Sequence, residues 1–277
     1  MPSAPHTPQA STLKPLITLT TDFGTTDTYV AQMKGVIAGI APDVRVVDST
    51  QNIPAQDILA GAVALDSLVD AFPDGTIHVA VVDPGVGSQR AAVAVKTERF
   101  TLVGPDNGLF TLVLDRYPPT AIVSLTNPDH HRDLVSATFH GRDIFAPVAA
   151  RLAAGVTISR LGEPVNTLVN LNIPQPEVTT NGLSVLTLTA DSFGNLITNL
   201  TQTFFNDWLT RANTKGATVS VKGHALGPVR RTFADVQPGE PVAYFGSSGR
   251  LELAIRNGSA KDLAGELPRV TLRAIPR

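Results

Sequence analysis

The chain has 277 residues, of which 43% are hydrophobic, 17% charged and 5% aromatic, a composition typical of a globular protein with one large or two ordinary domains. Its 22 lysines and arginines face 24 aspartates and glutamates, for a net charge of −2, which excludes a protein drawn to nucleic acid or an anionic membrane by overall charge. The chain has no cysteine. Thiolate catalysis, disulfides and Cys-ligated metal centres are therefore excluded, and a cytoplasmic location is expected.

The first fourteen residues, MPSAPHTPQASTLK, are polar and rich in proline. They lack the apolar core of a signal peptide, and we expect a disordered tail over residues 1–14. No later stretch of the sequence is apolar over the length of a membrane span.

From Leu16 to about Leu125, short β-rich runs alternate with segments of helical period. This is the pattern of βαβ units, and it predicts an α/β domain over residues 15–170 with a largely parallel sheet flanked by helices. The expected strands are Leu16–Thr20, Val44–Ser49, Thr76–Val82, Ala91–Lys96 and Ala121–Leu125. The expected helices, each with an apolar stripe, are Tyr29–Ile40, Ile58–Phe72 and Asp143–Ala154.

The composition changes in the second half of the chain. Residues 171–182 are rich in Pro, Asn and Thr and are interpreted as a linker. Residues 183–277 contain short alternating runs broken by Gly, Pro and Asn, which predict a smaller antiparallel β domain with one helix over Phe204–Arg211. The expected strands are Leu183–Thr189, Ala217–Val221, Pro241–Phe245, Leu251–Ile255 and Val270–Ala274.

The segment TTDFGTTD, from Thr20 to Asp27, follows the first expected strand and precedes a helix. In an open α/β sheet, ligands bind at this carboxyl edge of the strands. Asp22 and Asp27 could accept hydrogen bonds from a ribose diol, or one of them could cap the helix. We assign the cap to Asp27 and a ligand role to Asp22.

The segment VDPGVGSQR brings Asp83 out of an apolar strand into a glycine-containing turn, with Arg90 seven residues later. One interpretation is an ion pair across the mouth of a tight loop, and the other is a catalytic pair. The spacing alone does not choose between them.

His140 lies immediately before an expected helix in the segment SATFHGRDIF. The positive end of a helix disfavours the imidazolium and keeps a neutral ring available to hydrogen-bond a nucleophile. A structural histidine is the alternative. A metal site built from His140 with Asp22 or Asp83 is not favoured, because no ligand pair has i,i+4 spacing.

Two glycine-containing turns stand out in the β domain, namely Asp191-Ser-Phe-Gly-Asn195 and Phe245-Gly-Ser-Ser-Gly249. At such strand ends, backbone N–H groups and short polar side chains can converge on a carboxylate or an amine. Taken singly, each is also consistent with an ordinary hairpin connection.

Six blocks in order along the chain carry a family resemblance: TTDFGTTD, VDPGVGSQR, GPDNG, TFHGRDIFAP, DSFGNLITN and FGSSGRLELA. From about Leu16 to Ile275, the sequence resembles the S-adenosylmethionine hydroxide adenosyltransferase family, relatives of the fluorinase and chlorinase enzymes. The resemblance implies a seven-stranded N-domain joined to a β-barrel-like C-domain. It also implies a homotrimer that holds S-adenosyl-L-methionine between the N-domain of one subunit and the C-domain of its neighbour.

The resemblance also implies roles for individual residues of the N-domain. Asp22 would bind the ribose hydroxyls of the substrate. Asp83, Arg90 and His140 would form the water-activating trio of the family. No metal or other cofactor is implied.

In the C-domain, the resemblance implies that Asp191 meets the methionine amino group and that Asn195 supports the amino-acid or base end. Ser247 and Ser248 would receive the methionine carboxylate. Ser248 departs from the halogenases, which carry arginine at that position, so carboxylate binding would depend on N–H and hydroxyl groups.

The same comparison bears on the nucleophile. A halide site must strip water from an anion, and a neighbouring carboxylate would repel that anion. Asp83 and His140 stand where the halogenases resemble one another in carrying uncharged residues. We therefore expect hydrolysis of S-adenosyl-L-methionine to adenosine and L-methionine, by in-line attack of an activated water on the ribose C5′. The alternatives are a halide adenosyltransferase and a non-catalytic sensor of adenosine or S-adenosyl-L-methionine.

Overall fold

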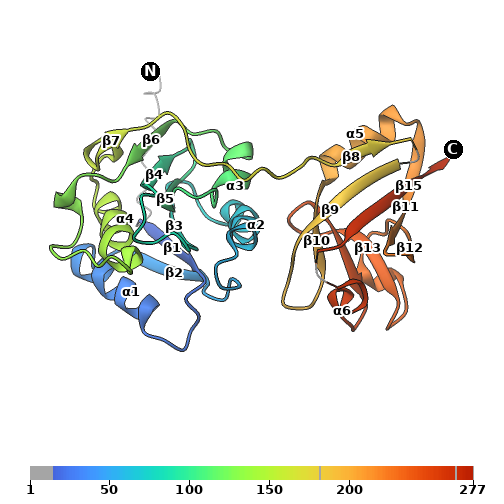
Figure 1. Ribbon diagram of the computed structural model, residues 1–277, viewed down its shortest axis with the longest axis horizontal. Helices are drawn as coiled ribbons and strands as arrows, with labels where there is room; N and C mark the ends of the chain where they lie inside the picture. Colours follow the sequence, from blue (N-terminus) through green and yellow to red (C-terminus); the bar gives the residue numbers. More distant parts are fainter. Residues whose placement is uncertain (1–14, 181, 266, 277) are drawn as a thin grey trace, which may run out of the picture. The chain divides into compact units, whose positions relative to one another are not determined.

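The computed structural model describes residues 15–180, 182–265 and 267–276, which form two compact units (Figure 1). The first unit comprises the chain up to Gly61 and Leu68–Val169, and the second comprises Ala62–Ser67 and the chain from Asn170 onward. The tail predicted over residues 1–14 lies outside the described residues. The change of unit after Val169 falls beside the expected end of the α/β domain at residue 170, whereas the assignment of Ala62–Ser67 to the second unit was not foreseen.

The first unit is built on a mixed seven-stranded sheet in the order β2-β1-β3-β5-β4-β6-β7 (Figure 1). Strands β2, β1, β3 and β5 are parallel, and β4, β6 and β7 continue the sheet in antiparallel pairing. The bounds are β1 Leu16–Thr21, β2 Arg45–Thr50, β3 Ile77–Val81, β4 Ala92–Lys96, β5 Thr101–Pro105, β6 Ala121–Ser124 and β7 Glu163–Pro164. The predicted α/β class is confirmed, while β5 and the antiparallel edge were not predicted.

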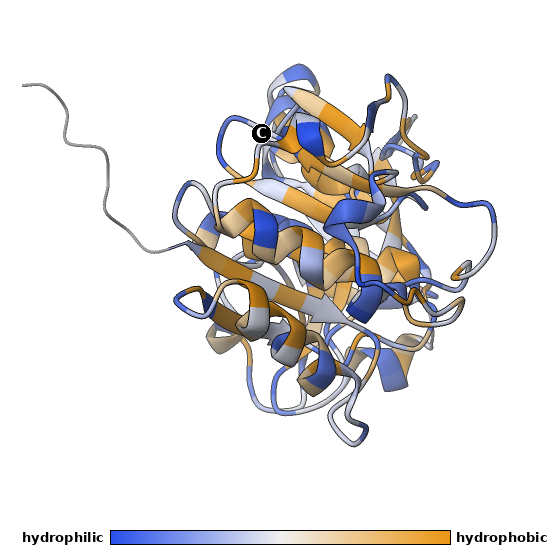
Figure 2. Ribbon diagram, turned by 90° about the vertical axis from the view of Figure 1, so that its left-hand side faces the viewer, coloured by the Kyte–Doolittle hydropathy of each residue, from blue (hydrophilic) through white to orange (hydrophobic). Residues whose placement is uncertain are grey.

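Two central strands explain why this sheet forms. Every residue of β1 and of β3 is buried, as expected for parallel strands that are covered on both faces. In Figure 2, long orange stretches run along strands, whereas many of the loops are blue or white. Burial of these apolar runs fixes the carboxyl ends of β1 and β3 side by side, and those ends carry two of the predicted site residues.

Helices α1 and α4 pack against each other, and α4 also contacts β1 and β3 (Figure 1). The predicted helix Tyr29–Ile40 is α1, whose N-cap is Thr28. Our prediction that Asp27 caps this helix is therefore wrong. The other helical segments of this unit are η1 Val69–Ala71, α3 Thr111–Arg116, η2 Pro128–His130, the π-helix η3 Gly141–Phe145, α4 Ala146–Ala153 and η4 Ile158–Arg160. Helix α2, Ile58–Leu68, is divided, because its residues Ala62–Ser67 belong to the second unit.

The second unit is an eight-stranded antiparallel sheet in the order β12-β11-β15-β9-β10-β14-β13, with β8 paired to β9. A bridge between Arg230 and Tyr244 joins the two ends, so the sheet is nearly closed and barrel-like, as predicted. The strands are β8 Glu177–Thr179, β9 Gly182–Ala190, β10 Leu196–Thr201, β11 Thr214–Val221, β12 His224–Pro228, β13 Pro241–Phe245, β14 Arg250–Ile255 and β15 Arg269–Pro276. The helical segments are α5 Gln202–Arg211, η5 Phe233–Asp235 and α6 Ala260–Ala264.

Helix α5 contains the predicted segment Phe204–Arg211 and places Phe205 and Trp208 in the core of this unit. Strands β8, β10 and β12 and helix α6 were not predicted, and β8 lies within the segment 171–182 that was interpreted as a linker. In the part of the chain that the structure describes, no helix is long and apolar enough to span a lipid bilayer.

Burial of His78 in β3 predicts acid sensitivity of the first unit. The side chain is fully buried between the rings of Phe72 and Phe100, and its Nδ1 lies 2.8 Å from Thr18 Oγ1. Burial lowers the pKa of His78 from 6.5 to about 4, so the unfolded chain binds the extra proton between these values. Stability should therefore fall as pH drops from 6.5 towards 4, by about 3 kcal/mol in all.

Denaturant unfolding at pH 7.0 and 4.5 measures this loss. The variant His78→Asn should show a smaller loss of unfolding free energy between the two pH values than the wild type. The exposed His224 supplies the control, His224→Asn, which should match the wild type. A wild-type loss that His78→Asn leaves unchanged would contradict the prediction.

Candidate active site

The carboxyl ends of the four parallel strands deliver polar side chains to one edge of the sheet. Gln51 follows β2, Asp22 follows β1, Asp83 lies two residues after β3, and Asn107 lies two residues after β5. Ligands of open α/β sheets bind at this edge. The sequence identified Asp22 and Asp83 here, but it did not identify Gln51 or Asn107.

Asp83 and Arg90 form a bidentate ion pair within one loop. Arg90 Nε lies 2.9 Å from Asp83 Oδ1 and 3.0 Å from Oδ2, and Arg90 Nη2 also donates to Oδ2. The Arg90 and Asp83 side chains are only 10% and 5% exposed. Charge-assisted pairs of this geometry are stronger and more directional than neutral hydrogen bonds, so the carboxylate is held in a fixed orientation.

His140 contacts the same guanidinium group at Nη2, the nitrogen that also donates to Asp83. Arg90 Nη2 lies 2.8 Å from His140 Nδ1. Because arginine nitrogens only donate, Nδ1 is the acceptor, and the proton of the neutral ring is on Nε2. Burial lowers the pKa of His140 below its ordinary value, and the positive charge of Arg90 lowers it further. The structure thus brings together Asp83, Arg90 and His140.

A close backbone contact holds the two loops of this cluster together. Gly87 has φ +78°, and a Cβ at this position would lie 2.4 Å from the carbonyl oxygen of Ala137. Only glycine allows both the positive φ and this approach. The loop that carries Asp83 and Arg90 therefore abuts the segment that leads to His140.

Asp22 lies at the same edge of the sheet, but its hydrogen bond is to a backbone N–H group outside the trio. Its Oδ2 accepts from the backbone N–H of Gln56 at 2.8 Å. The side chain is partly exposed. Asp22 therefore keeps acceptor capacity for a ligand while its carboxylate is anchored to the loop between β2 and α2.

The predicted residues of the second unit are in two hairpin turns. Asp191 Oδ1 accepts from the backbone N–H groups of Phe193 and Asn195, both at 2.9 Å, and Oδ2 accepts from Asn195 Nδ2 at 2.8 Å. Asp191 and Asn195 thus stabilise the β9–β10 turn as well as lying at its surface. In the β13–β14 turn, Ser247 is exposed, while the Ser248 hydroxyl is buried and has no hydrogen-bond partner among the described residues.

Tyr244 and Glu252 are near the β13–β14 turn, and no sequence pattern singled them out. They face each other across β13 and β14 and share a hydrogen bond. Burial raises the pKa of the Glu252 carboxyl, and the charge of Asp191 raises it further. Burial, followed by the charge of Glu252, also raises the pKa of the Tyr244 phenol. Asp191 and Glu252 are thus close enough to repel each other, and a cation between them would relieve that repulsion.

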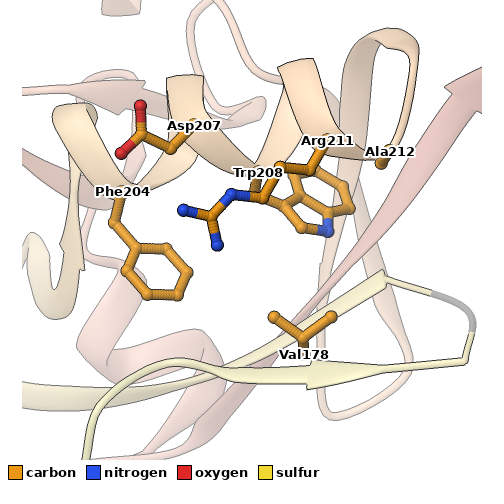
Figure 3. Close-up of a pocket in the computed structure, with 6 residues that line it drawn as sticks. All are labelled: Val178, Phe204, Asp207, Trp208, Arg211 and Ala212. Atoms are coloured by element: carbon orange, nitrogen blue, oxygen red, sulfur yellow. The ribbon is translucent and has the colours of Figure 1, made fainter.

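Cavities occur in each unit. A cavity of about 420 Å³ in the first unit is lined by Phe23, Tyr29, Gln32, Ser136, Thr138, Phe139 and Arg142. Two of these residues, Phe23 and Phe139, are sequence neighbours of Asp22 and His140. In the second unit, a pocket of about 340 Å³ is formed by α5 and β8, with Phe204 and Trp208 facing Val178 (Figure 3). That pocket contains none of the predicted site residues.

Over residues 15–180, 182–265 and 267–276, no cluster of three or more His, Asp or Glu side chains is arranged to hold a metal ion.

Both units match one family of proteins. Residues 17–162 match the SAM hydroxide adenosyltransferase N-terminal domain, and residues 187–268 match the SAM hydroxide adenosyltransferase C-terminal domain. The chain belongs to this family.

Its relatives include (R)-S-adenosyl-L-methionine hydrolases. The protein of that name from Thermus thermophilus is 45% identical over 88% of this chain and 93% of its own length. The one from Salinispora tropica is 41% identical over 94% of this chain and 97% of its own length. The fluorinase of Actinopolyspora mzabensis is 30% identical over 89% of this chain and 92% of its own length.

A solved structure shares the fold of this chain. The crystal structure of an uncharacterized conserved protein from Thermotoga maritima matches with a TM-score of 0.85 and 31% identity, covering 93% of this chain and 99% of the other.

Proposed function

We propose that this protein is an S-adenosyl-L-methionine hydrolase that forms adenosine and L-methionine. The observation that carries the proposal is the mutual contact of Asp83, Arg90 and His140 at the carboxyl edge of the parallel strands. The relatives named as (R)-S-adenosyl-L-methionine hydrolases support it, because they are 41% and 45% identical to this chain, whereas the fluorinase is 30% identical.

The chemistry requires an activated nucleophile rather than an acid. The sulfonium of S-adenosyl-L-methionine leaves as a neutral thioether, so its departure needs no proton. Water is a poor nucleophile, with a pKa of about 15.7, and an ordinary aspartate has a pKa of about 3.9. Asp83 therefore does not generate free hydroxide in advance. Loss of the water proton accompanies formation of the bond to carbon.

The contacts of the trio assign a separate role to each member. Arg90 keeps its proton and orients both of its neighbours. His140, with Nδ1 occupied by Arg90, donates its Nε2–H to the water oxygen, and the Asp83 carboxylate accepts the water proton. The oxygen bonds to C5′ as the C5′–S bond breaks, and the electron pair of that bond goes to sulfur. Fixing the water in line with C5′–S contributes on the order of 7–11 kcal/mol.

The cluster has no excess positive charge to hold a halide. The nearly buried Asp83 carboxylate is paired with the Arg90 guanidinium and the His140 ring is neutral, so nothing compensates the desolvation of an entering anion. A neutral water that donates one hydrogen bond and accepts another satisfies both Asp83 and His140.

The remaining predicted residues complete the proposed substrate site. Asp22 binds the ribose hydroxyls, Asp191 and Asn195 hold the amino-acid end, and Ser247 and Ser248 receive the carboxylate. The negative charges of Asp191 and Glu252 would suit the ammonium group of the amino-acid end, which supports the assignment of Asp191. The Ser248 hydroxyl has no hydrogen-bond partner among the described residues, which supports its assignment to the carboxylate. The homotrimer with intersubunit active sites and the cytoplasmic location remain predictions.

Asp191→Ala should weaken binding of S-adenosyl-L-methionine more than it slows turnover. Loss of a charged partner for the ammonium group corresponds to about 1.5–3 kcal/mol, so KM should rise by at least tenfold. Asp235→Ala is a matched control, because Asp235 also supports a turn of the second unit by accepting from two backbone N–H groups. Steady-state kinetics of both variants decide the point. Equal changes in KM would mean that Asp191 serves the fold alone.

Product analysis tests the proposed function. The purified protein is incubated with S-adenosyl-L-methionine, with and without added chloride or fluoride, and the nucleosides are separated. Adenosine and methionine formed in equal amounts, independently of halide, are expected. A halogenated adenosine would identify a halide adenosyltransferase, and retention of intact substrate without turnover would identify a sensor.

A further inference from the structure

We propose that Asn107 is a positioning residue for Asp83. Its side chain holds the peptide bond between Val82 and Asp83 in place and does not contact the substrate. The inference rests on the proposed function, because it assigns a role in the hydrolysis attributed to Asp83. Asn107 lies in the GPDNG segment, but no sequence pattern assigns a role to its side chain.

The side chain of Asn107 bridges two strand ends. Its Nδ2 donates to the carbonyl oxygen of Val82 at 2.8 Å, and its Oδ1 accepts from the backbone N–H of Leu109 at 3.2 Å. Val82 is fully buried, so its carbonyl oxygen would otherwise be left without a solvent partner, at a cost of about 1–3 kcal/mol.

The bonded carbonyl fixes the start of the catalytic loop. The carbonyl of Val82 and the nitrogen of Asp83 belong to one planar peptide. The same peptide ends at the Cα of Asp83, so a displacement of the peptide would also displace the base of the Asp83 side chain. The hydrogen bond from Asn107 therefore restrains the position of Asp83.

The neighbouring residue holds the other end of the same loop. The backbone N–H of Asp106 donates to the carbonyl oxygen of Ala91 at 2.9 Å, and Ala91 directly follows Arg90. Two consecutive residues after β5 thus anchor both ends of the loop that carries Asp83 and Arg90. Strand β5 packs closely beside β3 at Gly104. A Cβ at this position would lie 2.2 Å from the carbonyl oxygen of Ala80, so the close approach requires glycine.

This arrangement predicts a specific kinetic defect. A displacement of about 1 Å in a catalytic group costs about 10²-fold in rate, while the substrate contacts assigned to other residues persist. Asn107→Ala should lower kcat by roughly 10–100-fold and leave KM within about threefold of the wild type. Asn107→Asp keeps the acceptor for Leu109 but lacks the donor to Val82, and it should show the same defect.

Asn127 supplies a matched control in the first unit. Its Nδ2 donates to the carbonyl oxygen of Arg160 at 2.9 Å, and its Oδ1 accepts from the N–H of Asp129 at 3.1 Å. Asn127→Ala therefore loses the same pair of bonds at a position outside the loop from Asp83 to Arg90. Because these groups are exposed, it should lose less thermal stability than Asn107→Ala and should keep a kcat close to that of the wild type.

The experiment measures kcat, KM and thermal unfolding for Asn107→Ala, Asn107→Asp and Asn127→Ala, with Asp83→Asn included. A selective loss of kcat in both Asn107 variants supports the proposal. If Asp83→Asn abolishes turnover while the Asn107 variants match Asn127→Ala, the positioning role is overturned and the hydrolase proposal stands. If Asp83→Asn leaves turnover unchanged, the proposed role of Asp83 fails first, and that of Asn107 fails with it.

Discussion

Asp83→Asn should lower kcat for S-adenosyl-L-methionine hydrolysis by about 10²–10⁴-fold, the range expected for removal of a general base. Asparagine keeps the size of the side chain and one oxygen that accepts from Arg90 Nε, the atom 2.9 Å from Asp83 Oδ1 in the wild type. It cannot take the water proton. Because the substrate contacts are assigned to other residues, KM should change by less than about threefold.

The control for this variant is Asp74→Asn. Asp74 also pairs with an arginine in the first unit, since Arg99 Nε lies 2.7 Å from Asp74 Oδ1, but its side chain is 72% exposed. An exposed pair of this kind contributes about 0–1 kcal/mol, and kcat should remain that of the wild type. If Asp83→Asn raised KM and spared kcat, Asp83 would serve binding rather than catalysis.

The second large effect separates two roles for His140. His140→Ala should lower kcat by about 10²-fold, the cost of misplacing the attacking water by about 1 Å. His140→Gln carries an oxygen that can accept from Arg90 and an N–H group that can donate to water, so it should retain activity within about tenfold of the wild type, a cost of about 1.4 kcal/mol. A glutamine is not a general base. If His140→Gln were as inactive as His140→Ala, the imidazole rather than Asp83 would take the proton.

The pH dependence of kcat gives an independent readout of His140. The active ring is neutral, and burial followed by the charge of Arg90 lowers the pKa of His140 below 6.5. Activity should therefore be constant from pH 7 upward and should fall on the acid side with a midpoint below 6.5. This limb should be absent in His140→Gln.

The elements that the sequence predicted are those with strong apolar patterning. Helix α1 runs over Tyr29–Ile40 as expected, and the apolar runs at β1 and β3 are buried along their whole length. Strands β5 and β10 were missed for local reasons. The first ends in Gly-Pro. The second, Leu196–Thr201, contains Thr198 and Asn199, which make tertiary hydrogen bonds, and Thr201, which caps helix α5.

The trio illustrates what spacing can and cannot predict. From the sequence, Asp83 and Arg90 could be either an ion pair or a catalytic pair. In the structure they form the ion pair, and Arg90 also makes a hydrogen bond to His140. The attachment depends on Gly87 abutting Ala137, a contact between segments fifty residues apart. No local pattern encodes a contact of that kind.

In the second unit, the missed residues act through pairing across strands. The apolar alternation of β13 and β14 predicts the buried neighbours of Tyr244 and Glu252 but gives no role to these two residues. Their pairing is visible only when the register of β13 and β14 is known. Asp191 was chosen as a ligand residue, but the turn also uses it internally. A turn residue that serves both the fold and a ligand cannot be recognised from composition.

The most direct measurement is the position of the label after hydrolysis in ¹⁸O-enriched water. Attack of solvent on C5′ predicts one ¹⁸O atom at the 5′-oxygen of adenosine and none in methionine, as read by mass spectrometry of both products. Adenosine without the label, or a nucleoside carrying a halogen at C5′, would contradict the hydrolysis that Asp83, Arg90 and His140 are proposed to perform.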